Sequence, residues 1–333
     1  MTLTRGARIT GAALCAALAL IVGGWIVRDL GTVDHPLDLW RFWAGAGPGI
    51  GLGPGLSPPT TLLEDLLLFA VYVTVSIAAL RSSVASAALV AAGVITLALR
   101  LPGLWVLSST WMGIAATDEL RARALYATFA SLALGVGLLI TAVAGRSGRP
   151  GQAGRTTATR PRGGVRALAF VLLVVSAGVL AAWEIHTAVE YRGTDYLDRF
   201  TGSAAVMLPV FGIPPGWLTL VTVVLALVAG FGALVGAVFS RPLGLVAGVF
   251  VLGVGGRGLD VAVRNDLIAR LGDLPARQQL QVLSWLFELV AGAVLLMALA
   301  RRGEPDPDPE PEYGYGYPHA GSPPPPSSPP PGW

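Results

Sequence analysis

A few charged residues interrupt the long apolar stretches of this chain, and these residues are the ones best placed to do chemistry. Glu288 lies inside the last apolar stretch, and Arg100 and Arg257 lie late in two others. Burying an ionised side chain at the centre of a bilayer costs about 2.5–3.5 kcal/mol on insertion scales unless it is paired or hydrated. We therefore predict that Glu288 pairs with Arg257 or Arg100 inside a helix bundle. The alternative is that these charges have no functional role, and form a structural ion pair or reach the membrane interface.

Asp260 follows Arg257 by three residues, which places the two side chains on one face of a helix and lets them satisfy each other. The candidate intramembrane charge site therefore consists of Arg100, Arg257, Asp260 and Glu288.

A second polar group lies at the ends of the apolar stretches. His186 and Glu190 are four residues apart and share a helix face, and His35 occupies a loop of the other half. A metal or proton site could use such residues, but two histidines and a few acids match no zinc template, so no metal is predicted. Solvation at the membrane interface is the alternative. The candidate outer-face site consists of Glu64, Asp65, Glu184, His186 and Glu190.

These residues are positioned by eight apolar stretches that are long enough to cross a membrane. Of the 333 residues, 53% are hydrophobic and 13% are charged, whereas soluble chains carry about 25% charged residues. About 20 helical residues span the hydrocarbon core of a bilayer. The sequence thus predicts an all-α, polytopic transmembrane helix bundle with helices at 8–27, 62–80, 83–105, 124–144, 166–188, 217–240, 243–263 and 280–300.

Arginine and tryptophan placement predicts the orientation of these helices. With eight spans, the acid-free basic segments fall on one side, which favours the cytoplasmic side of the cell membrane and cytoplasmic N- and C-termini. These basic residues are Arg5, Arg8, Arg146, Arg149, Arg155, Arg160, Arg162, Arg166, Arg301 and Arg302. The tryptophans gather at the opposite, outer interface, as indole rings do. They are Trp25, Trp40, Trp43, Trp105, Trp111, Trp183, Trp217 and Trp285.

Paired landmarks indicate two tandem four-helix repeats. The landmarks are Trp25 and Trp183, Arg41-Phe42 and Arg199-Phe200, Pro58-Pro59 and Pro214-Pro215, Arg81 and Arg241, Arg100 and Arg257, and Arg146 and Arg301. An even number of spans per half makes the two copies parallel. The alternative is that any two four-helix stretches place Arg at inner ends and Trp at outer ends.

The sequence divides into four regions. Residues 1–150 and 165–302 form the two membrane repeats, and 151–164 form a basic cytoplasmic linker. Residues 303–333 alternate acids with prolines and end in polyproline, which predicts a disordered cytoplasmic tail. The tail could dock a cytoplasmic protein partner, or could be solvated without one. The net charge of +3 reflects loop arginines, so the lipid bilayer is the expected partner and nucleic acid is not.

Motifs for a catalytic or cofactor site are missing from the sequence. Residues 253–258 match GxGxxG, but they lie within an apolar helix rather than at a strand-to-helix turn, so no cofactor is predicted. Two apolar, Pro/Gly-broken loops, 43–57 and 201–213, occupy corresponding places. Such segments point to a transporter site if protein surrounds them. If it does not, they lie on the outer surface.

The arginine-only basic loops and proline-rich tail make the chain resemble multi-pass membrane proteins of GC-rich Gram-positive bacteria. That resemblance implies no catalytic residues. We expect a non-enzymatic carrier or accessory membrane subunit. The alternatives are a membrane-embedded enzyme acting at the outer face and a scaffold that recruits partners through its tail.

Overall fold

The protein is an all-α bundle, described by a computed structural model over residues 3–45, 59–81, 85–145, 159–160, 163–191, 193–203, 206, 208–301 and 304–305. Eight helical segments are long and apolar enough to cross a membrane, which confirms the predicted number and fits a multi-pass membrane protein. These spans are α1 (Arg5–Leu30), α3 (Leu63–Arg81), α4 with α5 (Ala85–Arg100 and Gly103–Ser108), α7 (Asp118–Ala144), α8 (Gly163–Glu190), α10 (Pro215–Leu234), α11 (Ser240–Arg264) and α12 (Ala276–Ala300).

Short elements connect the spans. They are α2 (Pro36–Trp43), α6 (Met112–Ala115), α9 (Thr194–Thr201), the 3-10 helix η1 (Leu271–Asp273), and the two-residue strands β1 (Thr159–Arg160) and β2 (Glu304–Pro305). The strands pair antiparallel, with Thr159 opposite Pro305 and Arg160 opposite Glu304. Residues 163 and 164 of the predicted linker already belong to α8. Residues 151–158, 161 and 162 of the linker, and 303 and 306–333 of the tail, lie outside the described residues, so both regions stay predictions.

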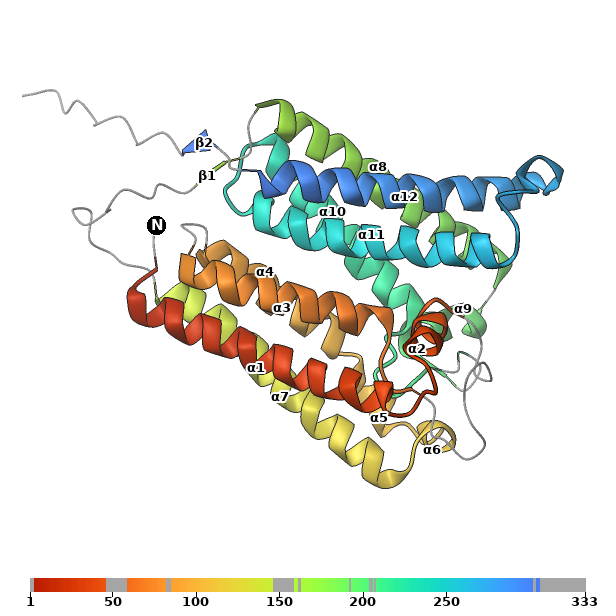
Figure 1. The fold of residues 1–333 in the computed structure, drawn as a ribbon, viewed down its shortest axis with the longest axis horizontal. Coiled ribbons are helices and arrows are strands. Elements are labelled where there is room, and N and C mark those ends of the chain that lie inside the picture. Colours follow the sequence, from red (N-terminus) through yellow and green to blue (C-terminus); the bar gives the residue numbers. More distant parts are fainter. Residues whose placement is uncertain are drawn as a thin grey trace, which may run out of the picture.

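The helices form two groups of four that lie side by side (Figure 1). The first group contains α1, α3, α4 and α7, and the second contains α8, α10, α11 and α12. In both groups the first helix packs on the second and the third on the fourth. The groups meet where α3 and α4 contact α10 and α11. A duplication would give this packing, and so would any two up-and-down bundles, so the repeat stays a prediction.

The two ends of the bundle differ in composition. The Trp-rich end is the end at which α1 stops and α3 starts, shown with α2, α5, α6 and α9 in Figure 1. The opposite, Arg-rich end carries Arg166 and Arg241, whose guanidinium groups donate to C-terminal carbonyls of α10 and α12. Cations are favourable there because the C-terminal end of a helix carries partial negative charge. These arginines therefore also hold helix ends together.

Tryptophan side chains join elements at the Trp-rich end. Pro102 interrupts the span of α4 and α5 and cannot donate to the carbonyl of Ala98 one turn earlier. The indole Nε1 of Trp217, on α10, donates to that carbonyl at 2.7 Å instead. Trp217 also packs edge-on against Trp105, with ring centroids 5.7 Å apart. A side chain of the second group thus supplies the hydrogen bond that this carbonyl of the first group lacks at the helix break.

Close contact between α11 and α12 depends on glycine. A Cβ at Gly255 would lie 2.8 Å from the carbonyl carbon of Glu288, and one at Gly292 would lie 2.6 Å from the backbone nitrogen of Leu252. Neither neighbour can swing aside, because both are backbone atoms.

We expect Gly255→Val to lower the free energy of unfolding by about 1–3 kcal/mol, as overpacking does. Denaturation in detergent micelles followed by circular dichroism measures the change. Gly256→Val is the matched control, since a Cβ at Gly256 has open space around it. Equal stability of the two variants would contradict the close packing.

Candidate functional site

A buried ion pair joins α3 to α4 near the Trp-rich end. Arg100, the last residue of α4, places Nη2 2.5 Å from Oδ1 of Asp65, in the first turn of α3. The two side chains are 6% and 3% exposed. The other carboxylate oxygen of Asp65 accepts the backbone N–H of Leu62 at 2.8 Å. The Arg100 guanidinium also lies over the ring of Phe211, 5.3 Å from its centroid, where a cation–π contact is favourable.

A second ion pair crosses between the two helix groups. Arg257 of α11 pairs with Glu64, the neighbour of Asp65 on α3. Glu64 is 6% exposed and Arg257 is 35% exposed. The structure thus brings together members of both predicted sites, because Arg100 and Arg257 converge on adjacent acids. The pairing is not symmetric between the halves, since both acids belong to the first.

The predicted pairing of Glu288 with Arg257 or Arg100 is wrong. Both arginines are engaged by α3, and neither oxygen of Glu288 has a hydrogen-bond partner among the described residues. Glu288 also lies deeper than expected. Because α12 begins at Ala276 rather than near residue 280, Glu288 stands twelve residues from each end of the helix.

Asp260 has partners other than the predicted Arg257. Its Oδ2 lies 2.5 Å from Nε of Arg264, one turn later on α11, and its Oδ1 accepts Nε1–H of Trp40 at 3.0 Å. Trp40 belongs to α2, between α1 and α3 in the chain, so this contact fixes that short connecting helix to a long helix of the second group. Asp260 is therefore a structural link at the Trp-rich end.

A buried carboxylate at the end of α1 is a polar centre that sequence reasoning missed. Asp29 is 0% exposed, and its Oδ2 accepts the backbone N–H groups of Thr60 and Thr61 at 2.8 and 2.7 Å. Both threonine hydroxyls donate to the same carboxylate, and Arg28 donates at 2.7 Å. Thr61 and Glu64 have the spacing of a capping box, which marks a helix start rich in unpaired donors. That signal could have identified the anion-binding segment.

The second of the two apolar loops folds into the protein. Leu208, Val210, Phe211 and Ile213 are all buried, and Phe211 packs on Trp25 with ring centroids 4.7 Å apart. The Phe211 N–H donates to the carbonyl of Thr60 at 2.9 Å, so this loop reaches the Asp29 centre. Protein therefore packs around residues 208–213 of this loop, whereas Thr201 at its start is exposed. In the first loop, residues 46–57 lie outside the described residues.

The other outer-face candidates do not gather around one point. Arg199 of α9 binds both carboxylate oxygens of Glu184 at 3.2 Å. Glu190 pairs with Arg277 of α12, and its Oε2 lies 3.7 Å from Nδ1 of His186. Within the described ranges, no group of three or more His, Cys, Asp or Glu side chains is arranged to hold a metal ion. Each acid is instead half of an ion pair between elements.

A cleft opens between the two helix groups in the Arg-rich half of the bundle. Its volume is about 410 Å³, within the range of small-molecule sites. Eleven of its thirteen lining residues are apolar, and the other two are Thr74 and Arg241. The lining comes from α3 (Ala70, Val71, Thr74, Val75, Ala78), α4 (Ala88), α11 (Arg241, Pro242, Leu245, Val246, Val249) and α12 (Leu296, Ala300). None of the predicted site residues lines this cleft.

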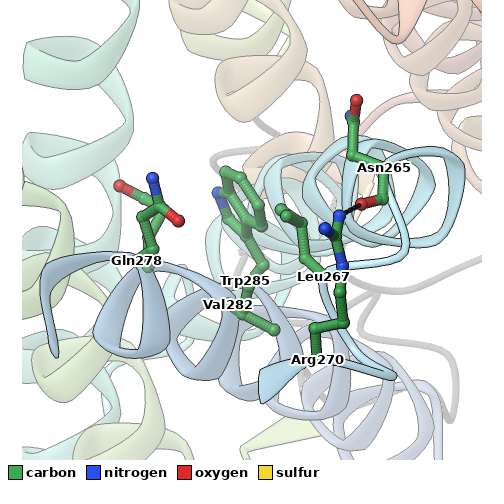
Figure 2. A pocket seen from close by; sticks show the side chains of 7 residues that line it. Asn265, Leu267, Arg270, Gln278, Val282 and Trp285 are labelled. Carbon is green, nitrogen blue, oxygen red and sulfur yellow. Dashed lines mark hydrogen bonds between the residues drawn. The ribbon is translucent and has the colours of Figure 1, made fainter. Parts of the chain in front are cut away.

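A more polar pocket of about 380 Å³ lies at the other end, beside the connection of α11 to α12. Figure 2 shows Trp285, Val282 and Leu267 between Gln278 on one side and Arg270 with Asn265 on the other. Nη2 of Arg270 donates to the backbone carbonyl of Asn265 at 2.8 Å. The side chains of Asn265, Arg270 and Gln278 are exposed, so this pocket is a surface hollow.

No protein-family model, curated protein or solved structure matches the chain.

Proposed function

We propose that this protein is a non-enzymatic membrane component that binds a lipidic solute in the cleft between α3 and α11, as a lipid carrier or a lipid-binding accessory subunit would. The observation that supports the proposal is the cleft itself, which is lined almost entirely by apolar side chains of membrane-spanning helices. Such a surface offers a polar substrate few partners, whereas a lipid chain matches it along its length.

The position of Arg241 favours a phospholipid as the occupant. Its guanidinium lies at the Arg-rich rim of the cleft, where it also holds the carbonyls of Leu299 and Arg301. A phosphate headgroup would find positive charge there while its chain extends between Val71 and Val246. Arg81 is the last residue of α3, and Arg301 directly follows α12. Both lie at this end of the bundle and add to its positive charge.

The ion pairs near the Trp-rich end support a structural role rather than a catalytic one. Asp65, Glu64 and Asp29 are each held by an arginine, and the contact of Asp65 with Arg100 joins two helices of the first group. The pair of Glu64 with Arg257 joins the two groups at one end while the cleft separates them at the other. With this arrangement the cleft can widen while the ion pair of Glu64 with Arg257 stays intact. An outer-face enzyme has less support, since its candidate acids are engaged in ion pairs.

Orientation in the cell membrane belongs to the same proposal. Arginine gathers at the end that holds the start of α1 and the end of α12, and this asymmetry favours cytoplasmic termini. The cleft then opens in the cytoplasmic half of the bilayer. The tandem repeat is proposed on the paired landmarks and on the shared order of helix packing.

A cleft-filling variant tests the proposal. We expect the purified protein to retain a phospholipid through mild delipidation and Thr74→Trp to lose it, because an indole at this exposed lining position fills the cleft. Native mass spectrometry counts the lipid retained. Val136→Trp, on the exposed face of α7, is the matched control and should retain it.

Retention of the same lipid by Thr74→Trp would contradict a site in the cleft. Equal retention of zwitterionic and anionic phospholipids by the native protein would remove the headgroup role given to Arg241 while leaving the chain site in place.

A further inference from the structure

Glu288 is a buried ionisable residue in the interior of the bundle. It is 1% exposed, stands at the middle of α12, and is therefore about 18 Å from either end of that helix at 1.5 Å per residue. Backbone closes over it on one side, because Gly255 of α11 packs directly on the backbone of Glu288 and Leu289. Both carboxyl oxygens of Glu288 are buried as well.

The cations of the helices around Glu288 are engaged elsewhere. On α11, Arg257 pairs with Glu64 and Arg264 pairs with Asp260, and on α12 itself Arg277 pairs with Glu190. On α8, Arg166 holds carbonyls of α10, and the acids Glu184 and Glu190 and the histidine His186 lie near the Trp-rich end. Arg241 of α11 binds carbonyls at the far end of α12. Among the described residues of α8, α11 and α12, none of these cations compensates an ionised Glu288.

The hydroxyl of Ser176, on the neighbouring helix α8, lies near the carboxyl group of Glu288. Ser176 is 0% exposed, and among the described residues its Oγ has no hydrogen-bond partner of normal geometry. Two buried polar groups from neighbouring helices thus lie together, and each lacks another partner. Leaving a buried polar group unpaired costs about 1–3 kcal/mol, and more for a charge. A carboxylic acid proton removes the charge and gives the pair a hydrogen bond.

We propose that Glu288 and Ser176 form an intramembrane proton-binding site, in which Glu288 carries a proton at neutral pH and shares a hydrogen bond with Ser176. The ligand is a single proton, which adds to one carboxylate oxygen and on release goes to water. Ionised Glu288 requires hydration, so proton release and water access to the space between α8 and α12 occur together. The site is independent of the lipid cleft, whose nearest residue on α12 is Leu296, two turns further along.

A proton fits this site better than a metal cation. One carboxyl group and one hydroxyl supply three side-chain oxygens, whereas magnesium and calcium take six or more oxygen ligands. The backbone carbonyls of α8 and α12 near Ser176 and Glu288 lie within helices, where intrahelical hydrogen bonds use them.

Infrared spectroscopy of the full-length protein in lipid tests the proposal. At pH 7 an exposed glutamate, with an ordinary pKa of about 4.3, is ionised and shows no carboxylic-acid C=O band. We expect the native protein to show such a band at pH 7, to shift it in deuterated water, and to lose it in Glu288→Gln. Glu119→Gln, at an exposed position on α7, is the control and should keep the band.

A native protein without a carboxylic-acid band at pH 7 would overturn the proposal, as would a band that persists in Glu288→Gln. A band that disappears when sodium is added would replace the proton by a cation. Should Glu288→Gln fail to fold, a hydrophobic carbodiimide, which reacts with protonated carboxyl groups, should label Glu288 and spare Asp65 in the native chain. Labelling of Asp65 without Glu288 would also overturn the proposal.

Discussion

Replacing Arg100 by methionine should lower the free energy of unfolding by about 3–5 kcal/mol, the cost of leaving a buried charge without its partner. Asp65 is 3% exposed and, among the described residues, contacts no other cation, so its carboxylate would be stranded between α3 and α4. The variant would also lose the contact of the guanidinium with Phe211. Denaturant unfolding in micelles, followed by tryptophan fluorescence, measures the change.

Two further variants separate the lost pair from lost packing. Asp65→Leu combined with Arg100→Met should recover most of the stability, because a buried pair replaced by apolar side chains leaves no stranded charge. Arg123→Met should have no measurable effect, since Arg123 and its partner Glu119 are both largely exposed. If Arg100→Met were as stable as Arg123→Met, or if the double variant gained nothing, the pair would not stabilise this end of the bundle.

Asp29→Ala should have a comparable effect through hydrogen bonds rather than charge pairing. The substitution leaves the N–H groups of Thr60 and Thr61 without an acceptor, at about 1–3 kcal/mol for each buried orphan. It also frees Arg28, and it removes the anion from the N-terminal end of α3. We expect a loss of about 2–6 kcal/mol in the same unfolding measurement, with faster hydrogen exchange at Thr60 and Thr61.

Asp34→Ala is the matched control for this carboxylate. Asp34 is exposed, five residues further along the same connection, and should tolerate alanine. If the two alanine variants unfolded alike, or if the amides of Thr60 and Thr61 exchanged no faster in Asp29→Ala, the Asp29 centre would not order the start of α3.

Hydropathy predicted the positions of the helices in the sequence better than the side-chain contacts between them. Eight stretches of about 20 apolar residues can satisfy their backbone groups in lipid only as helices, so number and approximate bounds follow from composition. Which residues of two helices meet depends on the rotation of each helix about its axis, and apolar stretches carry almost no amphipathic pattern that would reveal it. Depth alone therefore matches Glu288 with Arg257 or Arg100, although both arginines pair with acids of α3.

Helices that begin with a polar turn account for many of the other differences between the predicted and the observed positions of site residues. Residues 276–279 of α12 begin that helix one turn earlier than hydropathy indicated, which moves Glu288 to the centre of the span. The acids Glu64 and Asp65 looked like interfacial residues because they start α3. The end of α4 lies beside them and brings Arg100 into contact. Asp29, which precedes a loop, gave no sign in the sequence that it folds back onto the segment before α3.

The most direct test of the lipid cleft is to map where a phospholipid with a photoactivatable acyl chain attaches to the protein in a bilayer. We predict that label concentrates on residues 70–78 of α3 and 241–249 of α11, saturates at about one lipid per protein, and is displaced by unlabelled phospholipid. Label spread evenly over the exposed faces of α7 and α8, without saturation and unaffected by Thr74→Trp, would contradict a lipid site between the two helix groups.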